Sequence, residues 1–523
     1  MITKKRVKVE LDADVYLEGD LYLPGTEEKL PTLLFRTPYG KEVSQTYFFN
    51  PPQWFADKGY AVLIQDVRGR GKSTGEFKPI LGESTDGAVT SEWILNQSWS
   101  NQEIFGLGYS YCGLNQFLTQ QNSNNLTAIS PAMYFNSLTK NCLIQNNTVA
   151  ASFLLSWGQT LGGTTLKSLN KVELHKILLD ESIQDLTKFS KTNWFSEWID
   201  FCNNRYESAN CIDNSINIPV IHLGGFYDTF RKTVVDTFLA NQQLNPELNN
   251  LVIGPWNHFP SKQIENYSIE PQNYNKWSPS KYIVDFYDSI QKKKIIESNR
   301  RVRVCVLNNP DLEISGSTWP PVKTNEVNYF LGSSGQANFN PSDGILSVEN
   351  DNSVPDYLTY NHADPVILAG GDDCGDSSLL EMGPKVQNQN ESRFDILCYT
   401  SKLFEVDSIF IGNAFLEFFC ETADETSQWF SRICLVNKNN QSINLFDSII
   451  TMNNLDNLNK IKMDFGPISF CVKKGEKIRI QITNGGFPRW ESLRDSLGNL
   501  VVQNSTILHN LNYPSRLILP IAI

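Results

Sequence analysis

The chain has 523 residues, more than one hydrophobic core usually supports, so we expect two or three domains. Hydrophobic residues make up 40% of it and charged residues 20%, which is typical of a globular protein and excludes a disordered one. Its net charge of −12 repels phosphate backbones and anionic lipid surfaces, so we expect neither nucleic acid nor a membrane as a partner.

The N-terminus and the cysteines bear on the compartment. Basic residues occur up to Lys8, but an acidic segment follows where a signal peptide would have an apolar one, and no apolar stretch is long enough to span a membrane. The ten cysteines form no CxxC pair, which argues against a zinc site and a disulfide framework. We therefore predict a cytoplasmic protein with free thiols and with no metal or other cofactor.

The first 133 residues alternate between strand-like and helix-like patterns, as in βαβ units. A helix is predicted over 86–96, with Val89, Trp93 and Ile94 on its apolar face. Apolar runs predict buried strands at 31–36, 60–65 and 104–108.

The pattern of apolar and polar residues then changes twice. Residues 134–215 have longer helical patterns, for example over 166–179 and 193–201, and predict a helical insertion. Strand-like runs return at 218–223 and 250–253, and a helix is predicted near 282–292, so the α/β sheet resumes over 216–298. From 299 to 523, short alternating strands such as 301–307 and 477–482 predict a β-sandwich or jelly roll.

The segment Gly106–Gly113 (GLGYSYCG) follows a buried strand and precedes a helical pattern. A serine on such a sharp turn, here Ser110, is exposed at the carboxyl edge of the sheet, and the helix start beneath it favours a developing oxyanion. The spacing is G-x-S-x-x-G rather than G-x-S-x-G, so the motif gains its weight from other residues.

Those residues follow in order. Asp228 ends the segment after one predicted strand, and His258 follows the next, which gives the chain order Ser, Asp, His of α/β-hydrolases. Of the five histidines, only His258 is predicted on a loop after a sheet strand. A hydroxyl needs a base to become a nucleophile, and a carboxylate fixes the tautomer of that base, so we predict Ser110, His258 and Asp228 as a catalytic triad.

The chain resembles the cocaine esterase-like serine hydrolases, which are related to X-Pro dipeptidyl-peptidases and α-amino-acid ester hydrolases. The matching segments are Arg36–Lys41, Gln65–Phe77 with its DVRGRG run, Gly108–Gly113, Gly224–Asp228, Gly254–His258, Tyr399–Ser401 and Gly486–Arg489. The resemblance covers nearly the whole chain. It implies an α/β-hydrolase core, a helical cap inserted before the acidic residue, and a C-terminal jelly roll.

The resemblance also implies roles for single residues. Tyr39 would donate its phenol to the oxyanion beside the backbone N–H of Tyr111. Phe226 and Phe230 would line the acyl pocket, although both could equally be core aromatics. The chain departs from the family pattern at Tyr109 and Cys112, which changes the walls near the serine.

Two further features are interpreted as structural. We expect Asp66 and Arg68 to hold the loop under the site through a charge-assisted hydrogen bond. The acidic run Asp372–Asp376 could suggest a cation site, but we interpret it as a solvated turn.

The preferred function is hydrolysis of a carboxylic ester or amide of a small molecule through an acyl-enzyme. The same residues would serve an X-Pro dipeptidyl-peptidase or an acyltransferase of secondary metabolism. An inactive ligand-binding protein with a jelly roll is the alternative from another class, which the full set of site residues disfavours. The sequence leaves the acyl group, the leaving group and the oligomeric state, including a homodimer, open.

Overall fold

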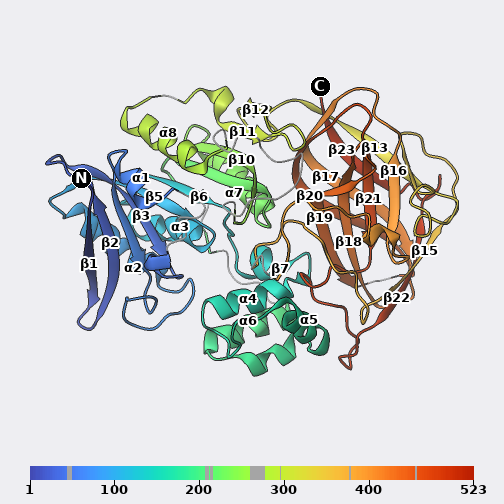
Figure 1. Ribbon diagram of the computed structural model, residues 1–523, viewed down its shortest axis with the longest axis horizontal. Coiled ribbons are helices and arrows are strands. Elements are labelled where there is room, and N and C mark those ends of the chain that lie inside the picture. The colour runs from blue at the N-terminus through green and yellow to red at the C-terminus, as the bar shows by residue number, and fades with distance from the viewer. Residues whose placement is uncertain are drawn as a thin grey trace.

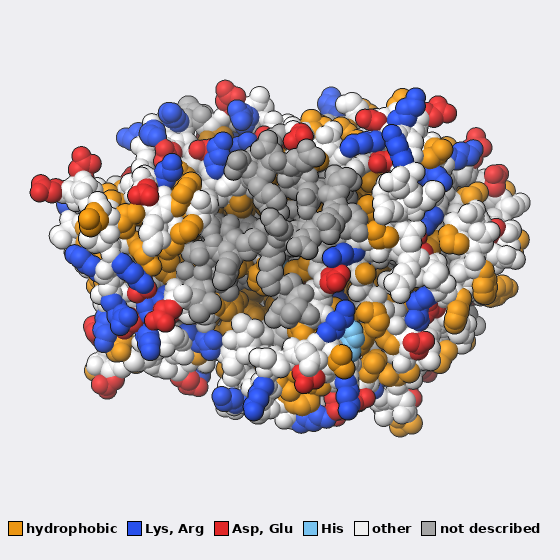
Figure 2. All heavy atoms as spheres, viewed as in Figure 1, with side chains coloured by type: hydrophobic (Ala, Val, Ile, Leu, Met, Phe, Trp, Pro, Cys, Tyr) orange, Lys and Arg blue, Asp and Glu red, His pale blue; other side chains and the backbone are white. Residues whose placement is uncertain are grey.

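The computed structural model describes residues 1–43, 50–205, 211–212, 216–259, 277–294, 296–375, 379–453 and 456–523. Strands β1 and β2 lie at one end of the molecule, the β-rich C-terminal part lies at the other, and three helices lie below the junction (Figure 1). On the face seen in Figure 2, Lys and Arg are interspersed with Asp and Glu, so the described part of this face carries no extended basic patch. No helix in the described ranges has both the length and the apolar character needed to span a bilayer.

The N-terminal part is built on one sheet with the strand order β1-β2-β4-β3-β5-β6-β9-β10-β11-β12. Pairing is parallel from β4 through β11, and antiparallel at both edges. The strands are β1 (Thr3–Asp12), β2 (Val15–Leu23), β3 (Leu30–Thr37), β4 (Ala61–Asp66), β5 (Ser100–Tyr109), β6 (Ala128–Ala132), β9 (Val220–Tyr227), β10 (Asn249–Asn257), β11 (Val302–Cys305) and β12 (Glu313–Gly316).

Central strands of this sheet are buried on both faces, which explains why their sequences are continuous apolar runs. The covering helices are α1 (Pro52–Ala56), α2 (Glu83–Leu95), α3 (Tyr111–Ser123), α7 (Arg231–Leu244) and α8 (Pro279–Gln291), with short 3₁₀ turns η1 (Lys41–Val43) and η4 (Ser298–Arg300). This arrangement brings the loops after β3, β5, β9 and β10 to one edge of the sheet, because the carboxyl ends of parallel strands meet there.

Helix α2 corrects one detail of the sequence prediction. Val89 is 40% exposed, whereas Ile94 is buried as predicted and Trp93 is partly buried against the core. Gly87 and Thr90 belong to the buried face as well. A Cβ at Gly87 would lie 2.1 Å from the hydroxyl of Thr119 in α3, so the two helices approach too closely there for a larger side chain. The prediction was wrong at Val89 because close packing on α3 decides the buried face.

Helices α4, α5 and α6 lie between β6 and β9 in the sequence and together below the junction in Figure 1. Helix α4 packs on α6: the rings of Trp157 and Trp198 stack at 4.8 Å, and Gly158 leaves the space that Phe195 fills. The elements of this segment are η2 (Thr139–Leu143), β7 (Ile144–Gln145), β8 (Thr148–Val149), α4 (Ala151–Thr160), α5 (Lys171–Asp180), η3 (Gln184–Phe189) and α6 (Asn193–Asn204).

The C-terminal part is a β domain whose strands are hydrogen-bonded in the order β15-β22-β17-β23-β13-β14-β16-β21-β18-β19, with β20 paired to β17. The expected strand over 301–307 does not belong to it. That segment forms β11, which pairs in parallel with β10 of the first sheet, and Val302 and Val304 are buried there. The elements of the β domain are β13 (Thr324–Gly332), β14 (Ile345–Ser347), β15 (Asp356–Asn361), η5 (Asn390–Ser392), β16 (Leu397–Ser401), β17 (Ser408–Glu421), β18 (Thr426–Val436), β19 (Ser442–Asn453), β20 (Leu458–Val472), β21 (Lys477–Thr483), β22 (Val502–Leu508) and β23 (Arg516–Ala522).

Candidate active site

Ser110 lies on a strained turn between β5 and α3. Its backbone has φ 57° and ψ −128°, a conformation that few non-glycine residues adopt and that is typical of nucleophile turns. The turn is so tight that a Cβ at Gly108 would lie only 2.6 Å from Cβ of Cys112, which leaves room for glycine alone at this position. Hydrogen bonds from the backbone N–H groups of Gly113 and Leu114 to the Ser110 carbonyl fix the serine at the start of the helix.

Asp228 and His258 are in direct contact. Nδ1 of His258 lies 2.5 Å from Oδ2 of Asp228, and the other carboxylate oxygen accepts a hydrogen bond from the backbone N–H of Phe230 at 2.8 Å. Asp228 is fully buried and His258 nearly so. The carboxylate therefore fixes the imidazole with Nδ1 protonated, which leaves Nε2 as the nitrogen able to accept a proton.

Tyr39 connects the serine to the helices below the junction. The Tyr39 side chain interacts with that of Ser110, and Nε1 of Trp157 in α4 donates to the Tyr39 hydroxyl at 3.1 Å. The described residues include no hydrogen bond between Ser110 and His258; the ring edge of Tyr109 instead meets the imidazole, with centroids 5.8 Å apart. Burial raises the pKa of the Tyr39 phenol, which keeps it protonated and able to donate.

The side chain of Tyr111 makes its hydrogen bonds away from Ser110. Its hydroxyl donates to Glu83 at 2.7 Å and accepts from the backbone N–H of Ile80 at 2.8 Å. Arg36 pairs with the other oxygen of Glu83 at 3.0 Å. The side chain thereby anchors the first residue of α3, whose backbone N–H has no partner within the helix.

Asp66 and Arg68 both form charged contacts near the candidate site, but they do not pair with each other. Asp66 accepts from the backbone N–H of Lys41 at 2.5 Å and pairs with the Lys41 ammonium at 3.1 Å, whereas Arg68 pairs with Asp86 at 2.6 Å. A Cβ at Gly71 (φ 54°) would lie 2.1 Å from the Asp66 carboxylate, so the DVRGRG loop requires glycine there.

The two candidate pocket phenylalanines occupy different surroundings. Phe230 packs on the His258 ring (centroids 5.6 Å apart) and on Phe135 (5.6 Å), which in turn contacts Trp157 (5.7 Å). Phe226 packs on Phe446 of β19 in the β domain. Aromatic rings therefore connect the imidazole to α4. Among the described ring contacts, Phe226 takes no part in this connection.

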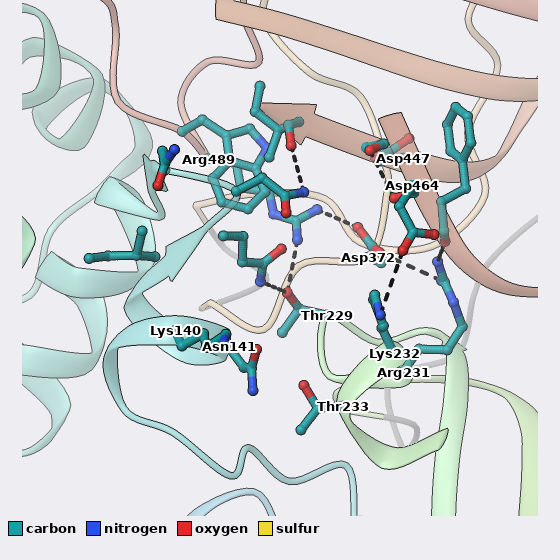
Figure 3. A pocket seen from close by; sticks show the side chains of 18 of the residues that line it. Lys140, Asn141, Thr229, Arg231, Lys232, Thr233, Asp372, Asp447, Asp464 and Arg489 are labelled. Carbon is teal, nitrogen blue, oxygen red and sulfur yellow. Dashed lines mark hydrogen bonds and ion pairs between the residues drawn. The ribbon is translucent and has the colours of Figure 1, made fainter. Parts of the chain in front are cut away.

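The β domain supports the loop after Asp228. Arg489 donates to the hydroxyl of Thr229 at 2.9 Å and pairs with Asp372 (Figure 3). Its Nε lies 3.8 Å from Asp373. Arg231 lies 3.6 Å from Asp372. The prediction of a solvated turn at 372–376 was wrong for these two aspartates, which are buried because two arginines neutralise them; Asp376 lies outside the described residues.

A polar cavity of about 380 Å³ adjoins Thr229 on the side of the β domain (Figure 3). Among the described residues that line it, neither Ser110 nor His258 occurs. The described residues contain no group of three or more His, Cys, Asp or Glu side chains that could hold a metal ion.

The sequence resembles known hydrolases over its whole length. Residues 12–260 match the family model described as X-Pro dipeptidyl-peptidase (S15 family). The chain is 25% identical over 570 aligned positions to cocaine esterase of Rhodococcus sp. (strain MB1 Bresler), an alignment that covers 98% of each chain. The chain is thus similar, over nearly its whole length, to cocaine esterase-like serine hydrolases. This confirms the resemblance stated from the sequence motifs, and that the protein is a hydrolytic enzyme.

Solved structures confirm the fold. An aminopeptidase from the marine sediment archaeon Thaumarchaeota archaeon superposes with a TM-score of 0.81 at 16% identity, covering 100% of this chain and 97% of the other. An α-amino acid ester hydrolase gives a TM-score of 0.78 at 16% identity, covering 99% and 96%. The α/β-hydrolase core with an additional β domain is therefore shown.

Sequence reasoning missed three contacts near the candidate site. It assigned no role to Trp157, Arg70 or Arg489, although the last two lie inside motifs that carried the resemblance. Each contact joins residues more than 30 positions apart, and no local pattern marks the partner.

Proposed function

We propose that this enzyme hydrolyses carboxylic esters with apolar, aromatic acyl groups, through an acyl-enzyme on Ser110 with His258 as the base and Asp228 as its partner. The observation that carries the proposal is the strained turn at Ser110, beside the Tyr39 phenol and a histidine held by a buried carboxylate. A hydroxyl donor, a nucleophile and an oriented base are the parts that acyl transfer requires.

In the proposed acylation step, Oγ of Ser110 attacks the ester carbonyl carbon and its proton passes to Nε2 of His258. The carbonyl oxygen becomes an oxyanion, which accepts hydrogen bonds from the Tyr39 phenol and the backbone N–H of Tyr111. The C–O bond then breaks, and the alcohol leaves with the proton from His258. Water, deprotonated by the same imidazole, releases the acid and restores the serine.

The Ser110 hydroxyl has to turn toward the imidazole for this step, because the described residues include no hydrogen bond between Ser110 and His258. When a substrate carbonyl occupies the oxyanion position, the Tyr39 O–H donates to that oxygen and the serine hydroxyl is free to rotate toward His258. Catalytic hydrogen bonds often tighten only once substrate is bound, so this geometry is compatible with the proposed roles.

The surroundings favour an aromatic acyl ester over an amino-terminal peptide. Phe135, Trp157 and Phe230 place ring surface beside the imidazole, which suits a flat apolar group. A peptidase that recognises a free N-terminus needs an available carboxylate, and those of Asp372 and Asp373 already face Arg489.

The test combines labelling with a substrate series. We expect a fluorophosphonate to form one adduct on Ser110, detected by mass spectrometry, which Ser110→Ala abolishes and the α2 variant Ser84→Ala retains. We expect aryl benzoates to be cleaved faster than aryl acetates and than glycyl-prolyl anilides. Turnover by Ser110→Ala at the wild-type rate would overturn the mechanism, and faster cleavage of the dipeptide anilide would overturn the substrate class.

A further inference from the structure

The second arginine of the DVRGRG motif, Arg70, has no place in the mechanism so far, yet it contacts two parts of the site. Its Nε donates to the carbonyl of Pro38 at 2.6 Å. Its two terminal nitrogens donate to the carbonyls of Leu161 (2.9 Å) and Thr160 (3.2 Å) at the end of α4. Pro38 immediately precedes Tyr39, and α4 carries Trp157.

The guanidinium is well suited to both contacts. The last carbonyls of a helix have no partner within it and carry partial negative charge, so a cation placed there is stabilised. No ion pair of Arg70 occurs in the described ranges, and burial lowers the pKa of its guanidinium. The position of Arg70 is therefore set by the Pro38 carbonyl, by the carbonyls at the end of α4 and by the ring of Phe77, whose centroid is 5.0 Å away.

The loop that holds Tyr39 needs such an anchor. Gly40 follows it with φ 94°, and no described residue other than its chain neighbours has an atom within 4 Å of where its Cβ would be, so none of them restrains this side of the loop by packing. A hydrogen bond to the Pro38 carbonyl fixes the peptide plane that leads into Tyr39. At the other end of the same residue, Trp157 holds the phenol.

We propose that Arg70 is a positioning residue that sets the oxyanion donor Tyr39 from helix α4, so that α4 and the Pro38–Tyr39 loop move as one unit. This inference rests on the proposed role of Tyr39. Helix α4 fixes Tyr39 twice, through Arg70 at its backbone and through Trp157 at its hydroxyl. The helical segment then determines the geometry of the catalytic donor in addition to covering the site.

The test is a double-mutant cycle between Arg70→Gln and Tyr39→Phe. We expect Arg70→Gln to lower kcat roughly ten- to hundredfold with a smaller change in KM, because displacement of a catalytic group by about 1 Å has that order of cost. In the Tyr39→Phe background the same substitution should change kcat less than about threefold, since the hydroxyl that it positions is gone. A purely structural role predicts equal losses in both backgrounds, which would overturn the proposal, as would wild-type kcat in Arg70→Gln.

Three further variants complete the design. Lys72→Gln removes an exposed cation from the same loop and should leave kcat unchanged. Arg70→Lys retains the charge but cannot bond both loops at once; it should fold and still lose kcat, and it replaces Arg70→Gln in the cycle if that variant does not fold. Ser110→Ala separates the two proposals: if it is inactive while Arg70→Gln matches the wild type, the positioning role alone fails, and if it is active, both fail.

Discussion

Substitution of Tyr39 by Phe removes one oxygen and the hydrogen bond that it accepts from Trp157. The ring remains, so packing is kept, but Nε1 of the buried Trp157 loses its acceptor. A buried donor without a partner costs about 1–3 kcal/mol, so we expect the free energy of unfolding to fall by that amount.

Activity should fall far more than stability. Loss of one oxyanion donor typically costs about 10²–10³ in kcat, equivalent to roughly 2.7–4 kcal/mol of transition-state stabilisation. We therefore expect kcat for an aryl benzoate to decrease by two to three orders of magnitude, with KM changed much less, because the donor acts on charge that develops only in the transition state.

The assay is steady-state kinetics on folded protein, with denaturant unfolding of the same sample. Trp157→Phe is the matched control, since it removes the donor to Tyr39 but leaves the phenol able to donate to an oxyanion. Its loss of kcat should be smaller than that of Tyr39→Phe. If Tyr39→Phe loses stability as expected but keeps kcat within about threefold, Tyr39 only packs and the reasoning is refuted.

Three more predictions follow from the same contacts. Asp228→Asn should lower kcat by roughly 10⁴-fold while the fold is retained by circular dichroism, because His258 loses the carboxylate that sets its tautomer; retention of most activity would contradict the role of Asp228. Burial lowers the pKa of His222 to about 4, so as the pH falls the imidazole is protonated in the unfolded chain before it is protonated in the folded protein. The free energy of unfolding should therefore fall by about 3 kcal/mol between pH 6.5 and pH 4. His222→Gln should flatten this part of the curve of stability against pH, and an unchanged slope would show that another group is responsible. Burial raises the pKa of Cys112 to about 12, so iodoacetamide at pH 8 should leave this thiol unmodified in folded protein and label it after unfolding, as read by peptide mass spectrometry; rapid labelling in the folded state would show that the thiol is accessible.

Local patterns were enough for part of the site. Strand-terminal positions identified Ser110, Asp228 and His258 as candidates, because a short apolar run followed by glycine and a polar residue marks the end of a buried parallel strand. The same reasoning went wrong where charge pairing over long distances decides burial. Asp372 and Asp373 look solvated in sequence but are buried, since Arg489, more than 100 positions later, lies against them. Val89 fits an apolar helical stripe but is exposed, because α3 approaches α2 at Gly87.

The sequence by itself determined the fold class, the order of the candidate triad and, through motifs such as DVRGRG, the resemblance to cocaine esterase-like hydrolases. These properties depend on hydrophobic period, turn residues and chain order, all of which are local or linear. Only the tertiary structure decided what surrounds the serine: that Trp157 and Arg70 connect Tyr39 to α4, that Arg489 supports the loop after Asp228, and that β11 joins the first sheet. Each of these contacts joins segments far apart in the chain, and its partner is selected by three-dimensional proximity and by the need to satisfy buried polar groups.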